Sequence, residues 1–180
     1  MSNILSRTGT SGTTSVLATS SNPITKIGVT SGATTTFTAT TVVDSVAWDL
    51  SAPVAGHFAK TSDGWIGLIN TVNDGTDTLT VNKWVRADGA SSDGKPVAGS
   101  TVTVHRVWRC NKLKVKADNS NAAGIHLRQN AAATASAYEL LANETITFIP
   151  EAGCKYVDAT LINAISSSGT ITLWFASDCE

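Results

Sequence analysis

Strict alternation of apolar and polar residues is clearest in the second half of the chain. In Lys112–Ala117, three lysines alternate with Leu113, Val115 and Ala117, so one face is polar and the other apolar. A period of two is typical of a β-strand with one solvated face. Similar segments follow at Ile125–Arg128, Thr145–Phe148, Tyr156–Ile162 and Ile171–Phe175. Short strands this close together predict a β-sandwich.

Between Pro23 and Trp108, short apolar segments are separated by turn residues. Asp63-Gly64 and Asn73-Asp74-Gly75 each stand between two such segments, and Asp-Gly is a strong hairpin signal. The predicted strands are Ile24–Thr30, Thr34–Val43, Gly56–Lys60, Trp65–Val72, Leu79–Arg86 and Thr101–Trp108. Strands divided in this way predict a small antiparallel sheet or barrel.

The N-terminal segment is rich in Ser, Thr and Gly and buries too little apolar surface to fold alone. Its isolated apolar residues are Ile4, Leu5, Val16 and Leu17. It is either a terminus without fixed structure or an extended arm that pairs with a neighbouring subunit. Threonine suits the arm, because it is β-branched and leaves the backbone free to pair.

The pattern thus predicts an all-β protein in three parts. These are an extended N-terminal arm (1–22), a small antiparallel β-barrel or sheet module (23–108) and a β-sandwich module (109–180). The alanine-rich stretch Asn130–Leu141 favours a helix by composition. We expect a loop there, because Thr134 and Ser136 interrupt the run.

Charge narrows the choice of partners. Charged residues make up 15% of the 180 residues and the net charge is −1, against about 25% charged residues in typical globular proteins. This balance argues against nucleic acid as the main partner, because phosphate binding needs clustered Lys and Arg. No apolar run is long enough to span a membrane, and Met1–Arg7 lacks the pattern of a secretory signal.

The cysteines and histidines give no pattern of a chemical site. Cys110, Cys154 and Cys179 form no C-x-x-C pair, which argues against a disulfide framework or a zinc site. The histidines each lie inside a predicted strand, and we expect them to face solvent or a boundary; they are His57, His105 and His126. No nucleophile motif accompanies them.

Most acidic residues lie in glycine turns, where an aspartate accepts hydrogen bonds from its own backbone. These are Asp63, Asp74, Asp88 and Asp93. Asp74 with Asp77, or Asp88 with Asp93, could contribute to a calcium site, but EF-hand spacing is missing. We therefore predict no catalytic residues, no cofactor and no metal.

Five tryptophans are many for a chain with few aromatic residues. Tryptophan usually fills a small core or an oligomer interface, and on a polar β loop it can bind sugars. Trp48, in the link Asp44–Leu50, and Trp174, opposite the face of Ile171 and Leu173, are the two interface candidates.

The region from Lys112 to Ser177 resembles a β-sandwich module common in bacteriophage virion proteins. The phrases that carry the resemblance are Leu113–Asp118 followed by Ile125-His126-Leu127, then Leu140–Phe148, Tyr156–Ala159 and Gly169–Leu173. The chain departs from the module at Asn143, where the module usually has Gly, and in a long insertion before Tyr138. The region Thr41–His105 is similar to a second small phage module. The phrases that carry this resemblance are Gly56–Ile69 and Asp77–Val85.

The resemblance implies a virion component without enzymatic activity. We expect a capsid decoration (cement) protein that binds the outer shell through its N-terminal arm and β modules. The expected partners are the major capsid protein or another virion protein, and further copies of the chain, with a trimer favoured. Assembly would take place in the host cytoplasm. The alternatives are a neck, tail or fibre-base protein of the virion, and a carbohydrate-binding adhesin module.

Overall fold

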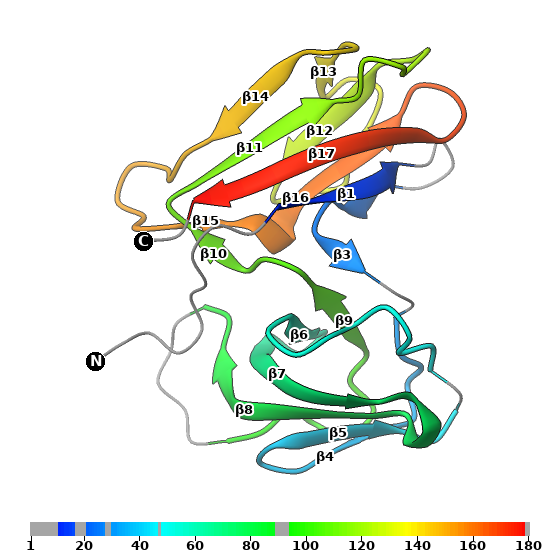
Figure 1. Ribbon diagram of the computed structural model, residues 1–180. Helices are drawn as coiled ribbons and strands as arrows, with labels where there is room; N and C mark the ends of the chain where they lie inside the picture. Colours follow the sequence, from blue (N-terminus) through cyan, green and yellow to red (C-terminus); the bar gives the residue numbers. More distant parts are fainter. Residues whose placement is uncertain (1–10, 17–20, 28–29, 47, 89–93, 179–180) are drawn as a thin grey trace. The chain divides into compact units, whose positions relative to one another are not determined.

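The computed structural model describes residues 11–16, 21–27, 30–46, 48–88 and 94–178. In these residues the regular structure consists of β-strands and two short 3₁₀ helices, η1 (Asp74–Thr76) and η2 (Ala159–Leu161), which confirms the all-β class (Figure 1). Contacts divide the chain into two units. Of the described residues, the first unit contains those of Ile27–Arg106, and the second joins those between Ser11 and Lys26 to Val107–Asp178.

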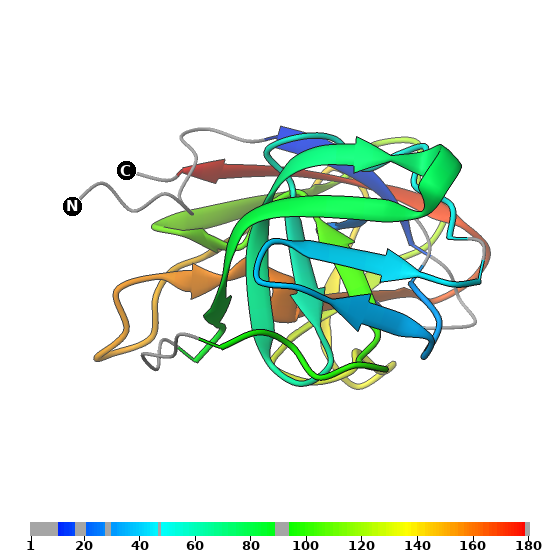
Figure 2. The same ribbon diagram turned by 90° about the horizontal axis from the view of Figure 1, so that it is seen from below.

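The first unit is built on one sheet with the strand order β3-β9-β6-β7-β8-β5-β4. The strands are β3 (Lys26–Ile27), β4 (Thr35–Phe37), β5 (Thr41–Asp44), β6 (Phe58–Thr61), β7 (Trp65–Asn73), β8 (Thr78–Arg86) and β9 (Val102–His105). The predicted turns Asp63-Gly64 and Asn73-Asp74-Gly75 do connect hairpins, β6–β7 and β7–β8. Register shifts on either side of Ile69 mark irregularities in the β7–β8 hairpin, which bends around the unit (Figure 2).

Three tryptophans lie in the core of this unit. Trp65 and Trp84 come from β7 and β8, and Trp48 comes from the link after β5. The ring of Phe37 meets that of Trp84 edge to face, with the ring centroids 5.6 Å apart. Aromatic side chains of this size supply a large share of the apolar area that a small domain can bury.

Two aspartates of the β7–β8 turn hold the link that carries Trp48. The backbone N–H of Trp48 donates to Asp77 Oδ1 over 2.9 Å, and that of Leu50 donates to Asp74 Oδ1 over 2.8 Å. Asp77 itself has a positive φ of 48°, a conformation that Asp tolerates better than most residues. These bonds satisfy the backbone of the link and fix Trp48 where its ring enters the core.

The second unit has two four-stranded sheets and one short strand pair. The sheets have the orders β1-β17-β11-β14 and β13-β12-β16-β2, and β10 pairs with β15. The strands are β1 (Ser11–Val16), β2 (Asn22–Pro23), β10 (Arg109–Cys110), β11 (Lys112–Ala117), β12 (Ile125–Gln129), β13 (Tyr138–Leu140), β14 (Thr145–Phe148), β15 (Val157–Asp158), β16 (Ile162–Ser166) and β17 (Ile171–Asp178). Apolar residues of both sheets share one core, as in a β-sandwich.

The N-terminal segment differs from the predicted arm. Ser11–Val16 forms β1, which pairs antiparallel with β17 of the same chain, and Asn22–Pro23 pairs with β16. A Thr-rich strand with a free backbone can extend the sheet of its own chain as readily as that of a neighbour. Ile4, Leu5 and Leu17 lie outside the described residues, as does the side chain of Val16.

Several predicted strands are shorter or divided in the structure. Thr34–Val43 is the hairpin β4–β5, because Thr38 Oγ1 accepts the backbone N–H of Thr41 and closes a tight turn. Of Ile24–Thr30, only Lys26–Ile27 is a described strand. Tyr156–Ile162 becomes β15 and η2, with β16 beginning at Ile162. The alanine-rich stretch is a loop up to Ala137, as predicted, and enters β13 at Tyr138.

Candidate interaction surfaces

Two of the three histidines are part of the folded interior. His105 is buried on β9, with Nε2 3.0 Å from Thr103 Oγ1. His126 is buried on β12. The prediction that they face solvent or a boundary is wrong for both, because neither strand has one fully exposed face. His57 is half-buried, and its Nδ1 accepts the backbone N–H of Val54.

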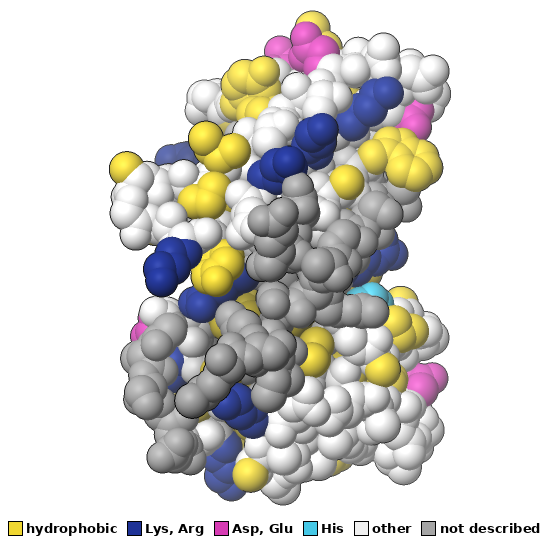
Figure 3. Space-filling view, turned by 60° about the vertical axis from the view of Figure 1, so that its left-hand side comes forward, with side chains coloured by type: hydrophobic (Ala, Val, Ile, Leu, Met, Phe, Trp, Pro, Cys, Tyr) yellow, Lys and Arg dark blue, Asp and Glu magenta, His cyan; other side chains and the backbone are white. Residues whose placement is uncertain are grey.

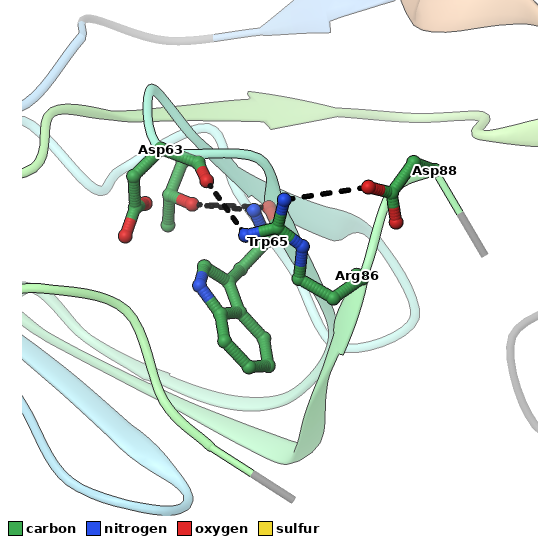
Figure 4. Close-up of polar contacts among 5 residues, drawn as sticks. Asp63, Trp65, Arg86 and Asp88 are labelled. Carbon is green, nitrogen blue, oxygen red and sulfur yellow. Dashed lines mark hydrogen bonds and ion pairs between the residues drawn. The ribbon is translucent and has the colours of Figure 1, made fainter. Parts of the chain in front are cut away.

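The best-defined polar cluster of the first unit surrounds the Asp63-Gly64 turn (Figure 4). The Arg86 guanidinium lies 5.6 Å from the centre of the Trp65 ring, donates to the Asp63 carbonyl and pairs with Asp88 at 3.3 Å. Asp63 Oδ2 accepts the backbone N–H of Val97. Burial raises the pKa of Asp63, but hydrogen bonds outweigh it and hold that pKa below its usual value. The cluster joins the turn at Asp63 and the loop at Val97 to the end of the β7–β8 hairpin at Arg86, so its role is structural.

Asp63 and Asp74 accept backbone N–H groups, but from the distant residues Val97 and Leu50, whereas the prediction was a bond to the backbone of their own turns. Asp93 lies outside the described residues. In the parts of the chain that the structure describes, no three His, Cys, Asp or Glu side chains are grouped where they could hold a metal ion. Cys110 is buried and Cys154 exposed. No helix among the described residues could cross a bilayer.

One side of the second unit combines a strand edge with exposed apolar side chains. β14 is the last strand of its sheet, so one of its backbone edges points away from β11 (Figure 1). Leu141 precedes β14 and is 52% exposed, and Ile149 follows it and is 67% exposed. Tyr138, on β13, is also exposed. We call β14 with these three residues the open edge.

The open edge has little that would prevent pairing with another chain. Natural edge strands are usually protected by charged residues, proline or a bulge. The sequence of β14 is Thr-Ile-Thr-Phe, with no charge and no proline. Its Ile146 and Phe148 pack on the core of the unit, which holds the strand in place while the edge remains open.

A second surface lies on the outer side of the same sheet. Lys112, Lys114 and Lys116 of β11 are exposed, as the alternation predicts, and Trp174 of β17 is 50% exposed beside them. Lys116 is the register partner of Trp174. The Trp174 indole N–H donates to Asp118 Oδ2 over 2.7 Å. We call these five residues the lysine–tryptophan face; Figure 3 shows basic side chains in a row with hydrophobic ones beside them.

The two predicted interface tryptophans have different positions. Trp174 has half of its surface open to solvent, which a contact residue requires. Trp48 is 2% exposed in the core of the first unit, so its ring is not available to a partner. The prediction that Trp48 is an interface residue is therefore wrong. Hydrogen bonds to Asp77 and Asp74 hold the backbone of its link, and the sequence pattern did not reveal them.

The open edge was not predicted. Leu141 lies between Leu140 and Ala142, and Ile149 between Phe148 and Pro150, so nothing in their sequence surroundings separates them from core positions. Leu141 lies in the connection from β13 to β14 and Ile149 in the loop after β14, so their exposure depends on where these connections lie in the folded unit. The signal that could have found the edge is the absence of a charged residue in the predicted strand Thr145–Phe148.

Comparisons with known proteins assign no family to the chain: no family model, no curated protein and no solved structure matches it.

Proposed function

We propose that this protein is a non-enzymatic structural protein of a bacteriophage virion that decorates the outer shell of the capsid. In this proposal the open edge binds the major capsid protein, or another virion protein, by strand pairing and by burial of Leu141 and Ile149. The observation that carries the proposal is the open edge itself: an uncharged edge strand with exposed apolar residues at both ends.

The sequence resemblance supports the same proposal. Its main phrases coincide with β11, with the turn and strand that form the open edge, and with β17. The aspartates at the turns already accept hydrogen bonds from backbone N–H groups of the fold. With a net charge of −1, association relies on shape and short-range contacts more than on long-range attraction.

The energy available at one open edge is small, so repetition matters. Complete burial of an aliphatic side chain contributes about 1.5–3 kcal/mol, and Leu141 and Ile149 are already partly covered, so together they offer about 2–3 kcal/mol. A decoration protein compensates by binding as an oligomer, here with a trimer favoured. Several edges then bind one repeating lattice, and the second contact forms at a high effective concentration.

The double substitution Leu141→Ser and Ile149→Ser is expected to weaken binding to particles stripped of this protein by about tenfold or more, because each contact loses apolar burial. The matched control is Val54→Ser with Val97→Ser in the first unit, since these residues are 51% and 67% exposed. Co-sedimentation with particles measures both affinities. Equal loss in the two pairs, or unchanged binding of the edge variant, would show that the open edge is not the contact.

A further inference from the structure

We infer that the lysine–tryptophan face binds an acidic polysaccharide whose sugars carry carboxylates, with Trp174 as a stacking platform and the lysines as the charge partners. This goes beyond decoration of a capsid, and its main residues, the lysines, Trp174 and Asp118, lie outside the open edge. A particle that carries the protein in many copies would display the face many times, so a weak site would be used multivalently.

The ring of Trp174 is held in a fixed orientation on an open face. It stands on β17, which has β1 on one side and β11 on the other, so its backbone is fixed by the sheet. Its indole N–H donates to Asp118, and Asp118 is held in turn by the backbone N–H and hydroxyl of Ser120. A ring fixed in advance loses little conformational freedom on binding. Its exposed apolar surface is suited to the flat apolar side of a sugar ring.

Two lysines beside the platform form no ion pair in the part of the fold that the structure describes, although the charge of Lys116 acts on Asp118. Among the described residues, Lys114 and Lys116 have no carboxylate within ion-pair distance. Alternate residues of a strand lie about 6.6–6.8 Å apart, so the lysines of β11 form an evenly spaced row. On the far side of that row, the exposed Thr145 and Thr147 of β14 are the register partners of Lys116 and Lys114. The face thus offers regular ammonium groups flanked by an aromatic ring and by hydroxyls.

Asp118 places a charged acceptor at the edge of the ring, which suits a ligand with many hydroxyl donors. The hydroxyl of Ser120, the indole of Trp174 and the Ser120 backbone lower the pKa of Asp118 to about 2, so its carboxylate is charged at neutral pH. The acidic groups of any bound chain must therefore point towards the lysines and away from this carboxylate. A sugar hydroxyl can instead donate to it. An acidic peptide would pair with the lysines but would make no use of the platform and its carboxylate together.

The test uses the full chain and polygalacturonate, with fully methyl-esterified polygalacturonate as the uncharged probe of the same backbone. We expect saturable binding of polygalacturonate by titration calorimetry, accompanied by a change in tryptophan fluorescence. The ester should bind about tenfold more weakly or worse, because it offers nothing to the lysines. Absence of binding to polygalacturonate would overturn the inference.

Variants assign the binding to the face. Lys114→Ser with Lys116→Ser, and separately Trp174→Ser, should each weaken binding about tenfold. The control Lys83→Ser with Lys155→Ser removes the same charge from exposed positions elsewhere and should change affinity less than about twofold. If both lysine pairs lost the same affinity for polygalacturonate, the effect would come from net charge, and a defined binding site on this face would be contradicted.

Two further measurements keep the outcomes distinct. A single-stranded DNA oligonucleotide that bound as tightly as polygalacturonate, and lost affinity in the same variants, would replace the saccharide with a nucleic acid. The variant Leu141→Ser with Ile149→Ser should bind polygalacturonate normally. A failure of capsid binding and a failure of saccharide binding can therefore be told apart.

Discussion

Replacing Trp84 by alanine is expected to lower the free energy of unfolding of the first unit by about 3–5 kcal/mol. The Trp84 ring is buried against Phe37 in the core of the first unit, and its Nε1 donates to the carbonyl of Thr38 over 3.2 Å. Alanine would leave a cavity and remove the donor. Since a domain is stable by only about 5–15 kcal/mol, the loss is large.

Denaturant unfolding followed by circular dichroism measures the effect. Trp84→Phe keeps a ring and should cost clearly less than Trp84→Ala. Trp174→Ala removes the same side chain from an exposed position and serves as the control for composition, with an expected change of about 0.5–1 kcal/mol. Similar losses at Trp84 and Trp174 would mean that the core of the first unit is not packed as the structure has it.

Replacing Asp44 by alanine is expected to cost about 3 kcal/mol or more, since it removes a buried acceptor from several donors. Asp44 Oδ2 accepts the backbone N–H of Gly32 over 2.7 Å, and Oδ1 accepts the hydroxyl of Thr34 and the backbone N–H of Val46. These bonds join the segment before β4 to the end of β5. Asp49→Ala is the matched control and should cost much less, because Asp49 is exposed and its hydrogen bonds within the described residues are to Ser51.

Asp44 also predicts a dependence of stability on pH. Burial raises the pKa of Asp44, but the hydrogen bonds from Thr34, Val46 and Gly32 outweigh it and hold the pKa below its ordinary value of 3.8. The unfolded chain therefore binds this proton more readily than the folded one. The contribution of the carboxylate is complete above the unfolded pKa, at about pH 4 and higher, and is lost as the pH falls through the folded pKa.

Asp44→Asn isolates this contribution from that of the other carboxylates. The difference in stability between the original chain and Asp44→Asn should be constant between pH 5 and pH 7, and should shrink below about pH 4. Denaturant midpoints measured across this range give the difference. A difference that stays constant or grows towards pH 3 would contradict the lowered pKa.

The local sequence pattern correctly predicted the strands that have one face exposed to water and the other packed against the core. β11 and β14 have the expected bounds, because lysine or threonine alternates with core residues along each strand. β1 was missed, because Ser-Gly-Thr-Thr-Ser-Val shows no such contrast and its place depends on the edge of β17. A strand of this kind is specified by its neighbour more than by its own side chains.

The surfaces were predicted only in part, for a related reason. The exposed lysines and Trp174 follow from alternation within single strands. Their association with Asp118 connects residues 56 positions apart, and no local pattern predicts such a contact. The prediction for Trp48 was wrong for a similar reason: the aspartates that fix its link, Asp74 and Asp77, lie in another hairpin, and no local pattern connects them to it.

If the N-terminal segment were only an arm, deletion of the whole predicted arm would test its role in binding. Because part of the segment belongs to the second unit, a shorter deletion is also needed. Deleting residues 2–22 would remove β1 and β2 from the second unit, so loss of binding would be mixed with loss of structure. Deleting residues 2–10 leaves both strands present. Comparison of the two deletions therefore separates a role in the sheet from a role in attachment.

The copy number of this chain in purified virions, obtained by quantitative mass spectrometry, tests the proposed function most directly. If the protein decorates the capsid, we expect hundreds of copies per particle. The number should be near that of the major capsid subunits, or about one third of it. About six or twelve copies would instead indicate a ring in the neck, tail or fibre base. Absence of the chain from the particles would contradict a virion protein altogether and leave the adhesin as the remaining hypothesis.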